Sequence, residues 1–294
     1  MKHPESRNTL HLEQAELLEH TAFEGDQYYM RLHAPLTASL AKPGNFIHMQ
    51  CDSDLPMRRP MSIMRVDKNA GWIDLLYKAH GVGTARLANR NVGETIDLIG
   101  PIGMPFKLDQ CKKYPLLIGG GVGIPPMVFL AEYIKSTAMD IRPFVIMGSE
   151  VPFPFSTKPS QIMLDGLPEG VIASMPLLED WGIPSRLTSL QGYSGCYDGN
   201  VTDLASHWLD SLDKETLNEV EIFSCGPTPM LKAVSHMAHR YGLACQISLE
   251  EYMACAVGGC AGCTVLVETE QGTSMKRVCV DGPVFKAASI FPPA

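Results

Sequence analysis

The stretch YPLLIGGGVGIPPMVFLAEYIKS, residues 114–136, decides the fold class of the chain. Its first half is an apolar run that ends in glycines, which is typical of a buried strand leading into a tight turn. Its second half is amphipathic and has prolines in its first turn, where a helix tolerates them. The segment therefore predicts a strand–turn–helix unit with glycines at the carboxyl end of the strand.

Strand and helix patterns alternate downstream of this unit. They cover the apolar runs 142–149, 171–176 and 220–227 and the helical segments 202–212 and 227–242. Strands that alternate with helices form a parallel, doubly wound sheet. We therefore predict a nucleotide-binding α/β domain over residues 105–245, within which residues 151–200 have the weakest pattern.

Upstream of Gly100-Pro101 the sequence has short strand patterns separated by turn signals. The predicted strands are 27–35, 44–51, 61–66, 72–80 and 95–100, with one short helix at 84–91. Closely spaced strands of this kind favour a small antiparallel barrel or sandwich, here a domain of residues 1–104. The remaining residues 246–294 contain clustered cysteines, a strand at 264–269 and a turn, and we predict a small third domain.

Composition narrows the function classes. Of the 294 residues 45% are hydrophobic and 19% charged, which excludes a disordered or fibrous protein. The net charge of −8 and the absence of a basic block argue against a nucleic-acid partner. The first 20 residues have no apolar signal-peptide core, and glycines and prolines interrupt the most apolar stretch. We expect a cytoplasmic protein that is not in a membrane.

Four of the nine cysteines follow the spacing C-x4-C-x2-C-x15-C, at Cys255, Cys260, Cys263 and Cys279. This is the plant-type [2Fe–2S] spacing, and the small residues between them let a loop wrap closely around a cluster. A structural zinc site, which usually has two C-x2-C pairs, and unligated buried thiols are the alternatives. The other five, Cys51, Cys111, Cys196, Cys225 and Cys245, are scattered, as small core residues often are.

Two glycine-containing turns follow predicted strands and open predicted helices. They comprise Gly119, Gly120, Gly121 and Gly123 in the first, and Cys225, Gly226 and Pro227 in the second. Glycines and a helix N-terminus are what a phosphate-binding loop needs, although an ordinary strand-to-helix turn has the same pattern. In a doubly wound sheet both turns lie at the same crevice, so together they favour a dinucleotide site.

The segment Arg58-Arg59-Pro60-Met61-Ser62 lies among the barrel strands. An arginine next to a hydroxyl can hold a phosphate and offer a donor to a ring nitrogen. Taken alone, these residues favour a surface strand with solvated arginines. The nine histidines show no metal-like spacing, and we interpret them as ordinary.

The motifs R-P-x-S, G-G-G-x-G-x-x-P and C-G-P occur in the order of the ferredoxin–NADP reductase superfamily. The segment M-A-C-A-V-G-G-C-A-G-C and the later V-C-V-D-G-P-V-F closely resemble the electron transfer subunits of NAD-dependent dihydroorotate dehydrogenase B. The resemblance covers roughly residues 14–286. Met61 departs from it, because many superfamily members have tyrosine there, and residues 151–200 are longer than expected.

The resemblance implies a flavin-binding barrel, a nucleotide-binding α/β domain and a cluster domain. FAD would be held by Arg59, Pro60, Met61, Ser62, Leu76, Tyr77, Lys78, Gly83 and Thr84. The four clustered cysteines would hold the [2Fe–2S] cluster, NAD would bind at the two glycine turns, and Cys225 would lie beside the nicotinamide.

The implied partner is an FMN-containing catalytic subunit that oxidises dihydroorotate to orotate in pyrimidine biosynthesis, in a heterotetramer. Flavin links two-electron nicotinamide chemistry to one-electron cluster chemistry, so the three cofactors form one electron path. The alternatives are a reductase subunit for a sulfite reductase, an oxygenase or a ferredoxin-linked complex, and a non-redox zinc-binding protein.

We expect a preference for NADH over NADPH. Glu150 follows the predicted strand 142–149, where dinucleotide folds contact the adenosine ribose. A carboxylate accepts hydrogen bonds from the 2′-hydroxyl of NADH and repels the 2′-phosphate of NADPH. The alternative is that Glu150 is a solvated loop residue with no ligand contact. NADH should be favoured by at least about tenfold in kcat/KM, or roughly 1.4 kcal/mol, and Glu150→Arg should narrow the gap. Equal wild-type kcat/KM values for the two cofactors would contradict the preference, and an unchanged ratio in Glu150→Arg only the role of Glu150.

Overall fold

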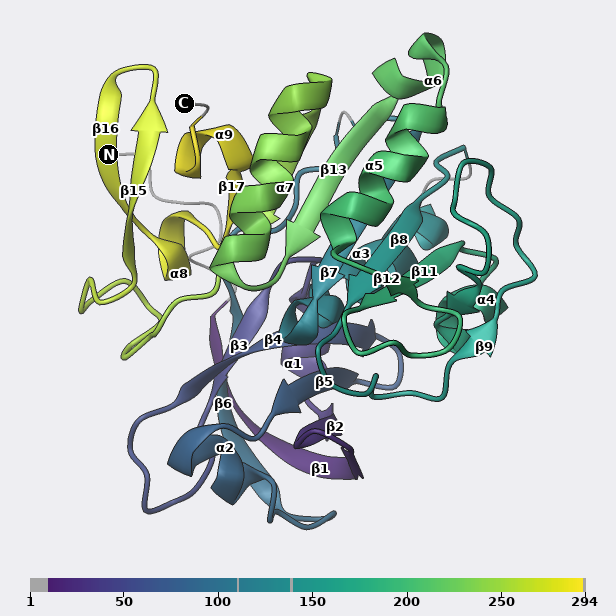
Figure 1. Ribbon diagram of the computed structural model, residues 1–294. Coiled ribbons are helices and arrows are strands. Elements are labelled where there is room, and N and C mark those ends of the chain that lie inside the picture. The colour runs from purple at the N-terminus through teal and green to yellow at the C-terminus, as the bar shows by residue number, and fades with distance from the viewer. Residues whose placement is uncertain (1–9, 110, 138–139, 293–294) are drawn as a thin grey trace. The chain divides into compact units, whose positions relative to one another are not determined.

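The computed structural model describes residues 10–109, 111–137 and 140–292 (Figure 1). Residues 1–9, part of the stretch assessed above for a signal peptide, lie outside the described residues. The chain divides into two compact units, residues 1–106 with 248–285, and residues 107–247 with 286–294. Within the described ranges, no helix has both the length and the apolar character needed to cross a bilayer.

The first unit contains a closed six-stranded barrel, which confirms the predicted barrel. Its strand order is β1-β2-β5-β4-β3-β6, and neighbouring strands are antiparallel. The strands are β1 (His11–Phe23), β2 (Gln27–His33), β3 (Phe46–Met49), β4 (Arg59–Asp67), β5 (Trp72–Lys78) and β6 (Thr95–Ile102). Two helices accompany them, α1 (Pro35–Leu40) and α2 (Gly81–Leu87). Leu17, Leu32, Ile63 and Leu75 are fully buried, as alternate residues of barrel strands are when they face the interior.

The same unit contains the cysteine-bearing segment, residues 248–285. Its hairpin consists of β15 (Thr264–Thr269) and β16 (Gly272–Arg277), paired from Thr264 opposite Arg277 to Thr269 opposite Gly272. The one-turn helix α8 (Val278–Asp281) follows directly, and the Asp281 carboxylate accepts a hydrogen bond from the Arg277 N–H at 2.8 Å.

The second unit is built on a sheet of order β12-β11-β8-β7-β13-β14-β17. The strands are β7 (Tyr114–Gly120), β8 (Phe144–Gly148), β11 (Ser185–Ser189), β12 (Tyr197–Asp198), β13 (Val220–Cys225), β14 (Ala244–Ser248) and β17 (Val284–Lys286), in which the two units divide. The pairs β7–β8, β7–β13, β8–β11 and β11–β12 are parallel, as predicted for a doubly wound sheet.

Helices cover both faces of this sheet. They are η2 (Gly121–Gly123), α3 (Ile124–Thr137), α4 (Pro176–Asp180), α5 (Val201–Ser211), α6 (Lys214–Asn218), α7 (Thr228–Tyr241) and α9 (Ala287–Ile290). Figure 1 shows α5 and α7 side by side, and they enclose a core with Leu116, Ile118 and Trp208. Gly119 alternates with Ile118 along β7 and faces Met127 of α3, so α3 lies on the opposite face.

One predicted strand is largely wrong. Of residues 171–176, only Ala173–Ser174 form a strand, β10, and it pairs antiparallel with β9 (Lys158–Pro159) outside the main sheet. The strand next to β8 is β11, from the segment with the weakest pattern. The Arg186 side chain on β11 is buried and donates to the carbonyls of Val171, Ser185 and Ile162, which holds the connecting chain in place.

The contact between the ends of β7 and β13 generates a stability prediction. A Cβ at Gly123 would lie 2.2 Å from the carbonyl oxygen of Cys225, whereas one at Gly121 would meet nothing within 4 Å. Gly123→Ala must force backbone apart, and we expect a cost of about 3 kcal/mol, seen as a lower thermal unfolding midpoint. Gly121→Asn is the matched control, because asparagine tolerates the positive φ of 54° at this position. Equal midpoints for the two variants would contradict the packing argument.

Candidate functional site

Two adjacent arginines at the start of β4 have different partners. The Arg58 Nη1 donates to the Asp97 carbonyl at 2.9 Å, and its Nη2 forms an ion pair with the Asp97 carboxylate. The Arg59 guanidinium donates only to the carbonyls of Met57 and Arg58, at 3.0 and 3.1 Å, and pairs with no carboxylate among the described residues. Arg59 therefore retains a charge that an anionic ligand can use.

The Arg59 side chain lies against the first turn of α2. A Cβ at Gly83 would lie 3.0 Å from Arg59 Nε, so glycine is what permits this contact. The Thr84 hydroxyl donates to the His80 carbonyl and accepts from the His80 N–H, both at 2.7 Å, which fixes the turn. The structure thus brings Arg59, Gly83 and Thr84 together in an arrangement that fits a phosphate group.

The other predicted flavin residues lie on β4 and β5. Met61 is buried opposite Ile47, and Pro60 and Ser62 are half-buried. Leu76 is buried and Lys78 exposed at the end of β5. The Tyr77 ring is also buried and stacks on Tyr28 with centroids 5.4 Å apart, and its hydroxyl contacts His20 Nε2 at 2.9 Å. No sequence pattern indicated this Tyr28–Tyr77–His20 arrangement.

His48 on β3 is a buried polar side chain that the sequence analysis treated as ordinary. It is 1% exposed, and neither ring nitrogen has a hydrogen-bond partner of good geometry among the described residues. Burial, followed by the charge of Arg58, lowers its pKa to about 4, so the ring is neutral near pH 7. An unsatisfied buried polar group costs about 1–3 kcal/mol. No spacing pattern marks this residue, because its environment arises from tertiary contacts.

The two glycine turns meet at the carboxyl ends of neighbouring parallel strands. Cys225 at the end of β13 is opposite Gly119 on β7, and a Cβ at Gly120 would lie 2.4 Å from Met230 Sδ, close to Pro227 as well. A Cβ at Gly226 would lie 2.5 Å from Met230 Cε. These glycines therefore permit the two turns to touch, while Gly121 faces open space at the start of α3.

Cys225 and Glu150 lie at the same edge of the sheet. Cys225 is 1% exposed, at the last position of β13. Glu150 is exposed, two residues beyond the end of β8, and β8 is the other neighbour of β7. The carboxyl ends of β8, β7 and β13 thus present the predicted nucleotide residues along one edge, which is where open α/β sheets bind ligands.

The four cysteines of the predicted cluster form two pairs. The β15–β16 hairpin brings Cys263 and Cys279 together, with their Sγ atoms 3.4 Å apart. On the preceding loop, the Cys260 N–H donates to Cys255 Sγ at 3.3 Å. Within the part of the chain that the structure describes, no three His, Cys, Asp or Glu side chains are gathered closely enough to hold a metal ion. The thiol donors fit an iron–sulfur cluster chemically, and the two pairs must approach each other to bind one.

The two pairs differ in protonation. Burial raises the pKa of Cys255, but the N–H groups of Cys260, Val257 and Gly259 and the Cys260 side chain outweigh it and lower the pKa to about 7. Burial, and then the hydrogen bond and charge of Cys263, raise the pKa of Cys279 to about 12. Metal binding requires thiolates, so loading must remove a proton from Cys279.

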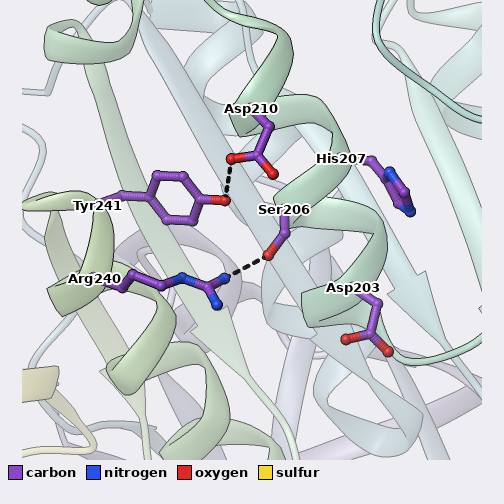
Figure 2. Close-up of a pocket in the computed structure, with 6 residues that line it drawn as sticks. All are labelled: Asp203, Ser206, His207, Asp210, Arg240 and Tyr241. Atoms are coloured by element: carbon purple, nitrogen blue, oxygen red, sulfur yellow. Dashed lines mark hydrogen bonds between the residues drawn. The ribbon is translucent and has the colours of Figure 1, made fainter.

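A polar hollow of about 610 Å³ lies between α5 and α7, lined by Asp203, Ser206, His207, Asp210, Arg240 and Tyr241 (Figure 2). Tyr241 donates to the Asp210 carboxylate at 2.6 Å and Arg240 to the Ser206 hydroxyl at 2.9 Å. Arg240 lies about 18 Å along α7 from Thr228, where the helix begins near the glycine turns. The hollow is therefore distinct from the predicted nucleotide site.

Comparison with known proteins agrees with these features. Residues 250–291 match the model of the iron–sulfur cluster binding domain of dihydroorotate dehydrogenase B. A relative from Shouchella clausii, named dihydroorotate dehydrogenase B (NAD(+)), electron transfer subunit, is 32% identical over 93% of this chain and 96% of its own length. A relative of the same name from Geobacillus sp. is 34% identical over 95% and 98%. The chain belongs to this family of electron transfer subunits.

Solved structures show the same fold. A structure described as an NADH-dependent reduced ferredoxin-NADP oxidoreductase, studied for flavin-based electron bifurcation, superposes with a TM-score of 0.74. It is 24% identical, over 95% of this chain and 90% of its own. The ferredoxin reductase in carbazole 1,9a-dioxygenase gives a TM-score of 0.61 at 21% identity, over 80% and 67%. The dihydroorotate dehydrogenase B electron transfer family thus shares the barrel and α/β architecture of ferredoxin reductases.

We expect Cys260→Ser to lose the iron–sulfur cluster and keep the flavin. Serine is a poor substitute for a thiolate ligand, whereas the Arg59–Gly83 contact does not involve this loop. Iron and sulfide analysis should show about two irons per chain in the wild type and a large loss in the variant. Cys196→Ser, a half-buried cysteine outside the loop, is the matched control and should keep its iron. Full iron content in Cys260→Ser would contradict the assignment.

Proposed function

We propose that this chain carries electrons between a catalytic subunit that oxidises dihydroorotate and NAD, through a [2Fe–2S] cluster and FAD. The observation that carries the proposal is the match of residues 250–291 to an iron–sulfur cluster binding domain, in a chain that also has the ferredoxin reductase barrel and sheet. Flavin accepts electrons in pairs from a nicotinamide and passes them singly, so it links the two other cofactors.

The barrel residues support the flavin part of the proposal. Arg59 would bind the pyrophosphate of FAD. Its guanidinium forms no ion pair with a carboxylate among the described residues, and it lies against Gly83. Arg58 is already paired with Asp97, which leaves Arg59 as the arginine of this motif that would bind the ligand. Pro60, Met61, Ser62, Leu76, Tyr77, Lys78 and Thr84 complete the proposed FAD set.

The sheet edge supports the nicotinamide part. The turns Gly119–Gly123 and Gly226–Pro227 would hold the NAD pyrophosphate at the start of α3, where backbone N–H groups and the helix dipole favour an anion. Cys225 would lie beside the nicotinamide, and its burial would keep water from the reacting ring. Glu150 is exposed and would meet the adenosine ribose.

The partner would be an FMN-containing catalytic subunit. The names of the relatives describe an electron transfer subunit of dihydroorotate dehydrogenase B, which implies a catalytic partner subunit for those proteins. We extend this to an FMN-containing subunit and to a heterotetramer. Clustered free thiolates as ligands favour a reducing compartment, so the proposal includes a cytoplasmic location.

The proposal predicts a coloured protein that completes a dihydroorotate:NAD assay. The purified chain should show flavin and iron–sulfur absorption bands, and NADH should bleach both. It should co-purify with an untagged catalytic subunit, and only the mixture should reduce NAD with dihydroorotate. The Cys260→Ser variant is the matched control, because its flavin should still be bleached by NADH while the coupled assay fails. A colourless zinc protein, or an active reductase that never couples to dihydroorotate, would contradict the proposal.

A further inference from the structure

His48 lies on the outer face of the barrel, beneath the cysteine-bearing segment. Its neighbours Ile47 and Met49 are fully buried and alternate with it, so they face the barrel interior. Phe46 shares the outward face, and a Cβ built on Gly103 would lie 3.2 Å from the Phe46 ring and 2.4 Å from Pro283. Residues of the 248–285 segment therefore cover this face of β3, and His48 is buried between them and the strand.

The ring of His48 stands between the flavin motif and the cluster loop. Pro60 of the flavin motif is directly opposite His48 in the β3–β4 pairing. The two backbone groups that act on the imidazole both raise its pKa, as carbonyl acceptors do. They belong to Arg58, next to that motif, and Met253, two residues before Cys255. Neither backbone group meets the ring nitrogens with full hydrogen-bond geometry. The Arg58 guanidinium does not bond to the ring either, because it is already paired with the carbonyl and carboxylate of Asp97.

A neutral imidazole has one N–H donor, so it can donate to only one of these two carbonyls, and the Met253 carbonyl is the one on the cluster loop. A polar side chain at 1% exposure normally has such partners. The two nearest candidates belong to the two segments that would carry the cofactors. A small approach of the cluster loop would bring the Met253 carbonyl within hydrogen-bond distance of the His48 N–H.

We propose that His48 is a positioning residue whose N–H ties the Met253 carbonyl of the cluster loop to β3. Because His48 is paired with Pro60 of the flavin motif, this contact sets the spacing between the two cofactors. This rests on the proposed function, in which FAD and the cluster exchange electrons. His48 touches neither reacting group, and its effect would be on electron transfer between them and not on hydride transfer from NADH.

Stopped-flow spectroscopy of the loaded full chain tests the proposal, with NADH as reductant and with flavin and cluster bands followed separately. His48→Leu should slow cluster reduction by about tenfold, the usual size of an outer-shell effect, and leave flavin reduction within about twofold of wild type. His48→Gln, whose amide can both donate and accept, should restore most of the rate. The electron paramagnetic resonance spectrum of the reduced cluster should shift in His48→Leu and not in His48→Gln.

Phe46→Leu is the matched control, since it alters apolar packing on the same face of β3 without removing a hydrogen bond. Wild-type cluster reduction in His48→Leu, or equal slowing in Phe46→Leu, would overturn the role of His48. If His48→Leu does not retain its cofactors, His48→Met serves as the apolar variant with the same expectations. A wild-type chain that binds no flavin or no cluster would instead overturn the proposed function, and this inference with it.

Discussion

The carbonyl oxygen of Cys225 occupies the space in which a side chain at Gly123 would stand. This contact joins the carboxyl ends of β7 and β13 and so fixes where α3 and α7 begin, which places the glycine turns at one edge of the sheet. The barrel uses the same device, because Gly83 lets a guanidinium lie against α2. In both units, a glycine allows a charged or polar group to approach the backbone closely at the place where a cofactor phosphate would bind.

The sequence patterns predicted the elements whose residues are strongly apolar or strongly periodic. The strand–turn–helix of residues 114–136 and five of the six barrel strands were of this kind. β1 was not predicted because its alternation is broken: Glu13 occupies a buried position, and Leu12 and Leu18 occupy exposed ones. β11 was missed for another reason. Its buried Arg186 and Ser185 are satisfied by contacts with Ile162, Val171 and Met175, which lie outside a local window around the strand.

The residues of the candidate site also differ in whether local sequence could predict them. The cysteine spacing is local, so the predicted ligands could be named without a structure, and the glycine turns follow their strands directly. The Tyr28–Tyr77 stack and the environment of His48 depend on which strands pair, and no sequence spacing contains that information. The pairing of Arg58 with Asp97, 39 residues away, likewise decides which of two adjacent arginines remains available.

The β15–β16 hairpin has little apolar burial of its own, since only Val267 among its residues is buried. A hairpin with such a weak hydrophobic pattern does not specify its own register strongly. Cys263 and Cys279 flank its open end and meet only in the observed pairing of Thr264 with Arg277. A slip of two residues would displace one sulfur by about 7 Å. A cluster that binds both sulfurs would thus stabilise this strand alignment over the slipped ones during folding.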